Sequence, residues 1–339
     1  MMGECSMFQR TEPFANGRSP LSGLALPTNR ELTVTTDDGV ALAVRDTGSN
    51  AATHTVVFLH GLCLSQLTWS VHIDRLVRRY GPAIRIISYD HRGHGRSQHA
   101  PMNTYSIDRL AEDLARVLEA AHVVGPTTLV GHSMGGMTAL GYLARPASGR
   151  PIDPAGLVLA ASAAGKLCCR GLGQLLGTPA TAALRGAAEH VPEQAMKAML
   201  SPLCVTLSRW RRNPPAATLA SLAVDAFSTV TLATAVGFLP ALRDYDQYPV
   251  LGSIRARTVV ISGGADPLTP PAHGRDLAGG IPGARHVHLP RAGHMLPQEA
   301  PHVLHQAIRR AMNIDSATEH DNAAGATTAA TPTLAGAAS

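Results

Sequence analysis

Short runs of consecutive apolar residues recur along most of the chain, and several are followed by segments in which apolar residues return every three or four positions. A short apolar run bounded by turns is typical of a strand buried on both faces of a parallel sheet, whereas the wider spacing predicts an amphipathic helix. The predicted strands are residues 55–59, 84–89, 127–130, 156–161, 257–262 and 285–289, most of them such apolar runs. Strands that alternate with helices in this way indicate an α/β fold with a mostly parallel, doubly wound sheet.

Helical spacing and turn residues complete this pattern. Helices are predicted over residues 67–80, with apolar positions at Leu67, Val71, Leu76 and Tyr80, over residues 106–121, and from Pro297 to about Asn313. Ser106 precedes an acid-rich first turn and is therefore expected to cap its helix. Ahead of the parallel strands, β-favouring residues flank Asp38-Gly39, which predicts a two-residue hairpin turn between antiparallel strands at the edge of the sheet.

The alternation of strands and helices stops between about residues 165 and 250, where Ala and Leu predominate and carboxylates are few. So long an insertion between two strands predicts a helical cap with an apolar inner surface. The expected organisation is an N-terminal extension (1–30), a first part of the α/β core (31–165), a helical cap after the sixth strand (166–250), a second part of the core (251–315) and a disordered tail rich in Ala and Thr (316–339).

Composition limits the kinds of partner and the cellular compartment that can be expected. The 29 basic and 24 acidic residues give a net charge of only +5 and are spread along the chain, so no nucleic-acid partner is expected. Five cysteines without a C-x-x-C spacing argue against a disulfide scaffold or a structural zinc site. The N-terminus lacks an apolar stretch of signal-peptide length, and a cytoplasmic protein is expected. A cluster at Arg209–Arg212 in the predicted cap leaves peripheral membrane contact open.

A candidate nucleophile lies where the strand at residues 127–130 turns directly into a helix. Gly131 and Gly135 flank Ser133 at the positions two before and two after it, where small residues let the two backbones pass. Such a turn projects the Ser133 hydroxyl above the sheet. It also places the Met134 N–H at the start of a helix, where unpaired donors and the helix dipole favour a developing anion.

A serine hydroxyl needs a base to accept its proton, and the base needs an acid to fix its tautomer. Of the sixteen histidines, His294 stands in a Gly-His step directly after the last predicted strand, and Asp266 follows the strand before it. His286 and His288 are expected to serve packing or the surface. Another pair, His91 and His94, is expected in a hydrogen-bonded turn, because no third ligand stands at a metal-binding spacing.

Four motifs in this order resemble those of the α/β-hydrolase superfamily, and the resemblance covers about residues 31–314. The motifs are HG at His60 and Gly61, DHRGHGRS from Asp90 to Ser97, GHSMGG around Ser133, and GGADPLTP with GHMLP around Asp266 and His294. The resemblance implies that the N–H of Leu62, directly after HG, joins that of Met134 in an oxyanion hole. It implies neither a metal nor a cofactor.

These features predict a serine hydrolase that cleaves a carboxylic ester with an apolar acyl chain, through Ser133, His294 and Asp266 and an acyl-enzyme. A small ester or lipid-like molecule is the expected substrate. Hydrolases of C–C bonds, thioesters or lactones, and peroxidase-like enzymes of the same superfamily, share this arrangement and stay open as alternatives. A ligand-binding protein on the same fold is the non-enzymatic alternative.

Overall fold

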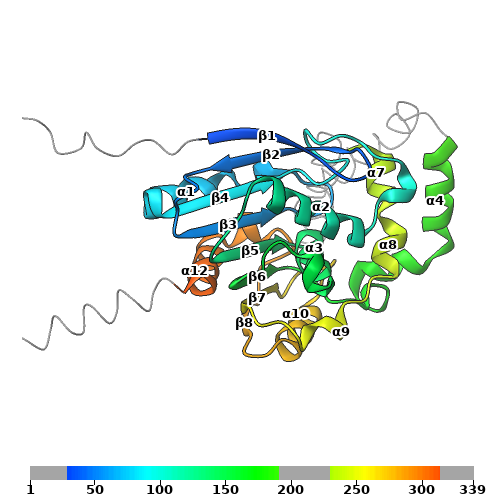
Figure 1. Cartoon of the computed structure of the whole chain (residues 1–339). Coiled ribbons are helices and arrows are strands. Elements are labelled where there is room, and N and C mark those ends of the chain that lie inside the picture. The colour runs from blue at the N-terminus through cyan, green and yellow to red at the C-terminus, as the bar shows by residue number, and fades with distance from the viewer. Residues whose placement is uncertain (1–28, 191–229, 314–339) are drawn as a thin grey trace, which may run out of the picture.

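A mostly parallel sheet with helices on both faces forms the body of the protein (Figure 1). The computed structural model describes residues 29–190 and 230–313. In the order in which they lie across the sheet, the strands are β1 (Asn29–Thr35), β2 (Ala41–Thr47), β4 (Ile84–Tyr89), β3 (His54–Leu59), β5 (Thr127–His132), β6 (Gly156–Ala160), β7 (Arg257–Gly263) and β8 (Arg285–Leu289). The pairs β1–β2 and β2–β4 are antiparallel and the others are parallel, as predicted.

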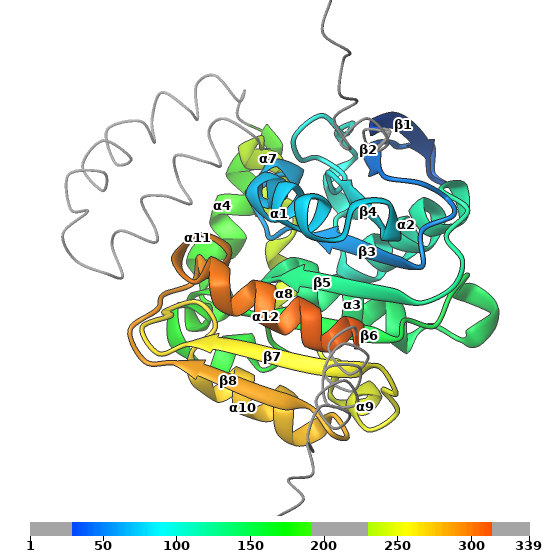
Figure 2. The same cartoon turned by 90° about the vertical axis from the view of Figure 1, so that its left-hand side faces the viewer.

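The helices of the described residues cover the two faces of the sheet or lie beyond the ends of its strands. They are α1 (Ser70–Tyr80), α2 (Ile107–Ala120), α3 (Met134–Ala144), α4 (Pro179–His190), α7 (Leu232–Gly237), α8 (Leu239–Arg243), α9 (Tyr248–Leu251), α10 (Pro271–Gly280), α11 (Leu296–Glu299) and α12 (Pro301–Met312). Figure 2 shows α1 and α12 on the same face, in front of the strands. The helix α10 was not predicted, because Gly274, Gly279 and Gly280 interrupt its apolar spacing.

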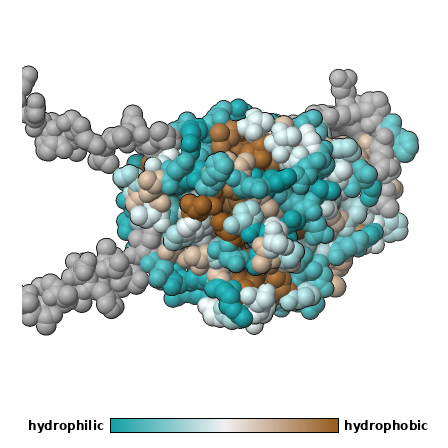
Figure 3. All heavy atoms as spheres, in the orientation of Figure 1, coloured by the Kyte–Doolittle hydropathy of each residue, from teal (hydrophilic) through white to brown (hydrophobic). Residues whose placement is uncertain are grey.

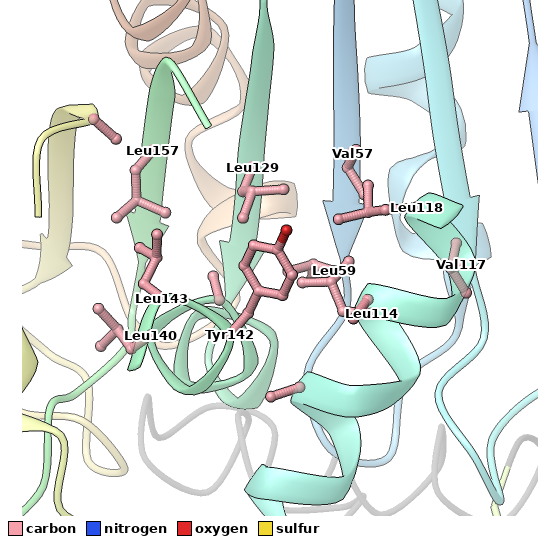
Figure 4. Close-up of a cluster of buried hydrophobic side chains, with 14 of the residues drawn as sticks. Val57, Leu59, Leu114, Val117, Leu118, Leu129, Leu140, Tyr142, Leu143 and Leu157 are labelled. Atoms are coloured by element: carbon pink, nitrogen blue, oxygen red, sulfur yellow. The ribbon is translucent and has the colours of Figure 1, made fainter. Parts of the chain in front are cut away.

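Alternate residues of the buried strands pack against helices on opposite faces, as the pleat of a strand requires. Val57 and Leu59 of β3 join the core under α2 and α3, shown in Figure 4, whereas Val56 and Phe58 join the core under α1 and α12. Burial on both faces explains why these strands are continuous apolar runs in the sequence. The face seen in Figure 3 is mostly hydrophilic, with hydrophobic residues in separate areas.

The predicted two-residue hairpin turn is wrong. The Thr36 N–H donates to the Val40 carbonyl at 3.0 Å, so the loop holds three residues, Asp37, Asp38 and Gly39. Gly39 takes a φ of +84°, which suits the glycine of a three-residue hairpin. The edge position of the hairpin is confirmed, since β1 is the outermost strand.

The predicted inner face of helix 67–80 is wrong at two of its positions. Leu67 and Val71 are 63% and 67% exposed, whereas the predicted Leu76 is buried, together with Trp69 and Ile73. A 3-10 turn over Gln66–Trp69 precedes α1 and shifts the phase of the helix.

A third correction concerns the C-terminal helix, which is two helices. Ala300 lies between α11 and α12 with φ −136° and ψ 52°, outside the helical region. Pro301 follows it, and a proline disfavours helical geometry in the residue before it. By contrast, the predicted cap of α2 is confirmed, because the Ser106 hydroxyl accepts the Arg109 N–H at 3.1 Å.

The chain between β6 and β7 contains α4, α7, α8 and α9 among its described residues, and Figure 1 shows α4, α7 and α8 beyond the right-hand end of the strands. The predicted domain boundaries, including those of the cap at 166 and 250, stay predictions. The extension up to residue 28, the Arg209–Arg212 cluster and the tail from residue 314 lie outside the described residues. Every helix within residues 29–190 and 230–313 is too short or too polar to span a bilayer.

Candidate active site

The turn between β5 and α3 holds Ser133 in an unusual backbone conformation. Its φ of 52° and ψ of −119° lie in a backbone region that residues other than glycine rarely adopt, so Ser133 is strained. Its N–H donates to the Ala160 carbonyl of the neighbouring strand at 2.9 Å, which holds the strained turn in place.

Two glycines make room for this turn. A Cβ atom on Gly131 would come within 2.5 Å of the backbone of Gly136, and one on Gly135 would overlap the Leu59 carbonyl oxygen of β3. Both positions therefore require glycine, as the sequence pattern predicted.

The structure brings Ser133, His294 and Asp266 together. Nε2 of His294 lies 3.0 Å from Oγ of Ser133, and Nδ1 of His294 lies 2.8 Å from Oδ2 of Asp266. A carboxylate only accepts hydrogen bonds, so the proton of the neutral imidazole belongs on Nδ1. Nε2 then presents a lone pair to the serine hydroxyl, which is the geometry that a general base needs.

Asp266 is held as a carboxylate although it is only 3% exposed. Burial alone would raise its pKa, but the charge and hydrogen bond of His294 and the hydroxyl of Thr269 outweigh burial, and the pKa lies below its usual value. The N–H groups of Leu268 and Thr269 donate to Oδ1 at 2.8 and 2.9 Å. These bonds leave Oδ2 directed at His294.

Two backbone donors flank the serine without an acceptor of their own. The N–H groups of Leu62 and Met134 donate to no acceptor among the described residues. Met134 begins α3, where the helix dipole favours negative charge. The pair is therefore available to an oxygen atom bound beside Ser133.

His60 stabilises the loop that carries Leu62. Its Nδ1 donates to the Gly61 carbonyl at 2.8 Å, and its Nε2 accepts the His91 N–H at 2.9 Å. Burial lowers the pKa of His60 and keeps the ring neutral. The two histidines hold backbone rather than a metal, and the described residues include no group of three or more metal-ligating side chains.

His94 supports the next residue of the same loop. Cys63 has a φ of 63°, and its N–H donates to Nε2 of His94 at 3.2 Å. Nδ1 of His94 donates to the Arg92 carbonyl at 3.0 Å, and burial lowers the pKa of His94 to about 3, so Nε2 stays an acceptor. His94 also pairs with Val230 in an isolated β-bridge, and its ring lies 5.9 Å from that of Phe238. It therefore connects the Leu62–Cys63 loop with the segment after residue 229.

Sequence reasoning missed a further supporting residue, Glu299. Its carboxylate accepts the N–H of Gly293 at 2.6 Å and the N–H of Met295 at 3.0 Å, one on each side of His294. His132 adds a third restraint, because its Nε2 donates to the His294 carbonyl at 2.8 Å. A glutamate five residues after a Gly-His step belongs to no sequence pattern that would predict its role. The role is visible only in the structure, where α11 places the carboxylate beside the backbone of His294.

The position after β6 holds Ser162 and no carboxylate. Its hydroxyl donates to the Ser133 carbonyl at 2.9 Å, so it restrains the turn. His286 and His288 both bond the Ser262 hydroxyl on the adjacent strand, at 2.8 and 3.2 Å, and do not contact Ser133.

Apolar side chains gather above the turn. The buried members of this cluster are Tyr105, Ile107, Leu110, Met134, Met137, Ala163, Leu167, Phe238, Leu242 and Tyr245, and Leu62 packs against it. Met134 thus belongs to a buried apolar cluster that also holds Phe238 and, from α8, Leu242, and Leu62 packs against the same cluster.

The chain matches the model of a known family, described as the alpha/beta hydrolase family, over residues 56–307. It is 32% identical over 252 residues to the polyketide synthase ThaQ of Burkholderia thailandensis, covering 70% of this chain and 11% of that protein. It is 27% identical to the AB hydrolase superfamily protein YisY of Bacillus subtilis, covering 77% of this chain and 91% of YisY.

Among solved structures, a thermophilic esterase from Thermogutta terrifontis is similar with a TM-score of 0.62 and 26% identity, covering 83% of this chain and 97% of the esterase. The first curated relatives are matched over short parts of their length. This chain spans 11% of ThaQ, 25% of a zebrafish diacylglycerol lipase and 41% of a Streptomyces lividans non-heme chloroperoxidase.

Proposed function

Because the chain belongs to the α/β-hydrolase family, we propose that it is a serine hydrolase that cleaves a carboxylic ester with an apolar acyl chain. The observation that carries the proposal is the pair of contacts made by one imidazole, 3.0 Å from the Ser133 hydroxyl and 2.8 Å from the Asp266 carboxylate. In this proposal Ser133 is the nucleophile, His294 the general base and Asp266 the residue that fixes the His294 tautomer.

The reaction runs in two steps. Oγ of Ser133 attacks the ester carbonyl while Nε2 of His294 takes its proton, and the carbonyl oxygen becomes an oxyanion that accepts the N–H groups of Leu62 and Met134. Collapse expels the alcohol, which receives the proton from His294, and leaves an acyl-enzyme. A water deprotonated by His294 then attacks the acyl carbon, and the second collapse releases the acid and restores Ser133.

Two features support an apolar acyl group. Leu62 and Met134 border the cluster that contains Leu167 and Phe238, so an ester held by their N–H groups extends its chain along apolar side chains. The Thermogutta terrifontis relative is an esterase. The proposed mechanism uses neither a metal nor a cofactor. A small ester or lipid-like molecule stays the predicted substrate, and the cytoplasm stays the predicted compartment.

The same residues serve hydrolysis of a thioester, a lactone or a C–C bond, and the chloroperoxidase relative keeps peroxidase-like chemistry among the alternatives. A ligand-binding protein would use the fold without turnover. A panel of p-nitrophenyl esters, thioesters and lactones separates the hydrolytic alternatives from one another.

The first test replaces the nucleophile. Ser133→Ala is expected to abolish hydrolysis of p-nitrophenyl butyrate with an unchanged melting temperature, whereas Ser253→Ala, at an exposed serine, keeps wild-type turnover. Near-normal turnover in folded Ser133→Ala would contradict the proposal. A wild-type protein that is inactive on the whole panel, and also on a diketone substrate for C–C hydrolysis and in a peroxidase assay, would favour the ligand-binding alternative.

A further inference from the structure

A cleft of about 550 Å³ lies between α1 and α12. Both helices lie on the face of the sheet opposite to α2 and α3, because they cover a separate core, and Figure 2 shows them together in front of the strands. The lining residues of the cleft are Arg75, Leu76, Arg78, Arg79, His302, His305, Gln306 and Arg309. The lining thus contains four guanidinium groups, two imidazoles and no carboxylate.

Helical geometry concentrates these cations. Residues three and four apart share a face of a helix, so Arg75, Arg78 and Arg79 of α1 point to the same side. None of the three forms an ion pair within the described chain, whereas the buried Arg85 and Arg92 are each paired with a carboxylate. The helix dipole accounts for basic residues in the last turn of α1, but Arg75 lies before that turn.

The floor of the cleft is His305, which is 9% exposed. The Pro297 carbonyl accepts a hydrogen bond from Nε2 of His72 at 3.0 Å, so Nδ1 of neutral His72 carries only a lone pair. Nδ1 of His72 lies 3.2 Å from Nε2 of His305, which must therefore donate. Nδ1 of His305 is then the ring nitrogen without a proton in the neutral form, and no described residue forms a hydrogen bond with it.

We propose that this cleft binds a phosphate-type oxyanion, carried by a small molecule or by a lipid headgroup, with Arg75 and its neighbouring guanidinium groups around the anion and Nδ1–H of protonated His305 beneath it. Guanidinium groups match the oxygen geometry of phosphate, and a protonated buried imidazole adds a charge-assisted donor. The inference is independent of the hydrolase activity.

Binding at such a site takes up a proton. Burial, with the charges of His72, Arg75 and His302 around the ring, lowers the pKa of His305 to about 4, so the ring is neutral at pH 7 in the free protein. The other titratable groups that line the cleft on α1 and α12, Arg78, Arg79 and Arg309, are also basic. An anion in the cleft reverses their effect and raises the pKa. Binding should therefore strengthen as the pH falls from 8 towards the pKa of the free ring.

The test is calorimetric titration of the full chain with sodium sulfate at pH 6.5, at constant ionic strength, in two buffers that differ in ionisation enthalpy. Sulfate stays a dianion throughout, so a proton taken up on binding comes to the protein and not to the probe. Inorganic phosphate is titrated next. Sedimentation with phosphatidylglycerol vesicles, against phosphatidylcholine vesicles, examines the headgroup source.

Variants locate the site. Arg75→Gln removes an exposed charge without touching the core and should weaken binding about tenfold, the effect of one lost charge-assisted hydrogen bond. His305→Gln can still donate to His72 but cannot titrate, so the proton uptake should disappear. Arg285→Gln, at an exposed arginine of β8, is the matched control and should change neither quantity.

Binding of sulfate and phosphate with proton uptake, weakened by Arg75→Gln, supports a soluble ligand. Binding confined to phosphatidylglycerol vesicles and lost in both cleft variants supports a headgroup. Three results overturn the proposal: no binding to any probe, binding without proton uptake in the wild type, or equal losses in Arg75→Gln and Arg285→Gln.

Discussion

The N–H of Cys63 donates to Nε2 of His94, so a buried imidazole fixes the backbone one residue after the Leu62 donor. The ring of His94 lies 5.9 Å from the ring of Phe238, and the His94 backbone pairs with Val230 in an isolated β-bridge. Val230 and Phe238 both belong to the chain between β6 and β7. This one residue thus joins the loop that carries the proposed Leu62 donor to the segment that holds Val230 and Phe238.

His94→Phe keeps an aromatic ring beside Phe238 but removes the acceptor for the Cys63 N–H. The loop is then free to shift the Leu62 donor, and kcat for p-nitrophenyl butyrate should fall by about 10- to 100-fold, less than the loss of a whole oxyanion donor. KM should change little, because the apolar surface is kept. His288→Phe is the control. An equal rise in KM with unchanged kcat would assign His94 to substrate binding instead.

Asp266→Asn tests control of the imidazole tautomer. An amide can donate to Nδ1 of His294 and so favour the tautomer with its proton on Nε2, which cannot accept from Ser133. Turnover should fall by about 10³- to 10⁴-fold with the fold intact, while His288→Ala retains most of it. If the two variants ranked the other way round, the acid and base would have been misassigned.

Glu299 holds the backbone on both sides of His294. Glu299→Ala leaves two N–H groups without their acceptor, and the free energy of unfolding should fall by about 1–3 kcal/mol, since bonds to charged groups contribute more than neutral ones. We also expect kcat to fall about tenfold, because His294 loses its restraint. Gln298→Ala, next to it and exposed, should alter neither. Full activity in a folded Glu299→Ala protein would remove the positioning role.

The apolar cluster beside Leu62 and Met134 predicts a dependence on acyl length. Each buried methylene contributes about 0.8 kcal/mol, so kcat/KM should rise up to about fourfold per carbon from p-nitrophenyl acetate through hexanoate until the site is full. A p-nitrophenyl succinyl ester should be a poor substrate, since its charge would lie against apolar side chains. A flat or falling series would contradict the apolar acyl site.

Sequence pattern predicted what depends on local order along the chain. Ser133, Asp266 and His294 lie just beyond the carboxyl ends of β5, β7 and β8. The carboxyl ends of parallel strands meet at one edge of the sheet, so the convergence of the three residues could be expected. The inner face of α1 could not be predicted in this way. The 3-10 turn that shifts its phase is held by hydrogen bonds of Gln66 with Asp90, which follows β4 and is distant in the sequence.

The residues that support the site were harder to predict from the sequence than Ser133, Asp266 and His294. Glu299 accepts hydrogen bonds from backbone N–H groups. Nearly every residue has such a group, so the sequence does not show which residues Glu299 contacts. His94 was expected in a hydrogen-bonded turn, and its bond to the Arg92 carbonyl fits that. Its contact with Cys63 crosses 31 positions of sequence and depends on how two loops meet.

The central claim is that Ser133 forms a covalent acyl intermediate, and active-site titration with diethyl p-nitrophenyl phosphate tests it most directly. The reagent should release about one equivalent of p-nitrophenol per chain. Peptide mass mapping should then place one diethylphosphoryl group on Ser133, and Ser133→Ala should give neither product. Stoichiometric modification of another residue, or full ester hydrolysis after complete modification of Ser133, would contradict the account.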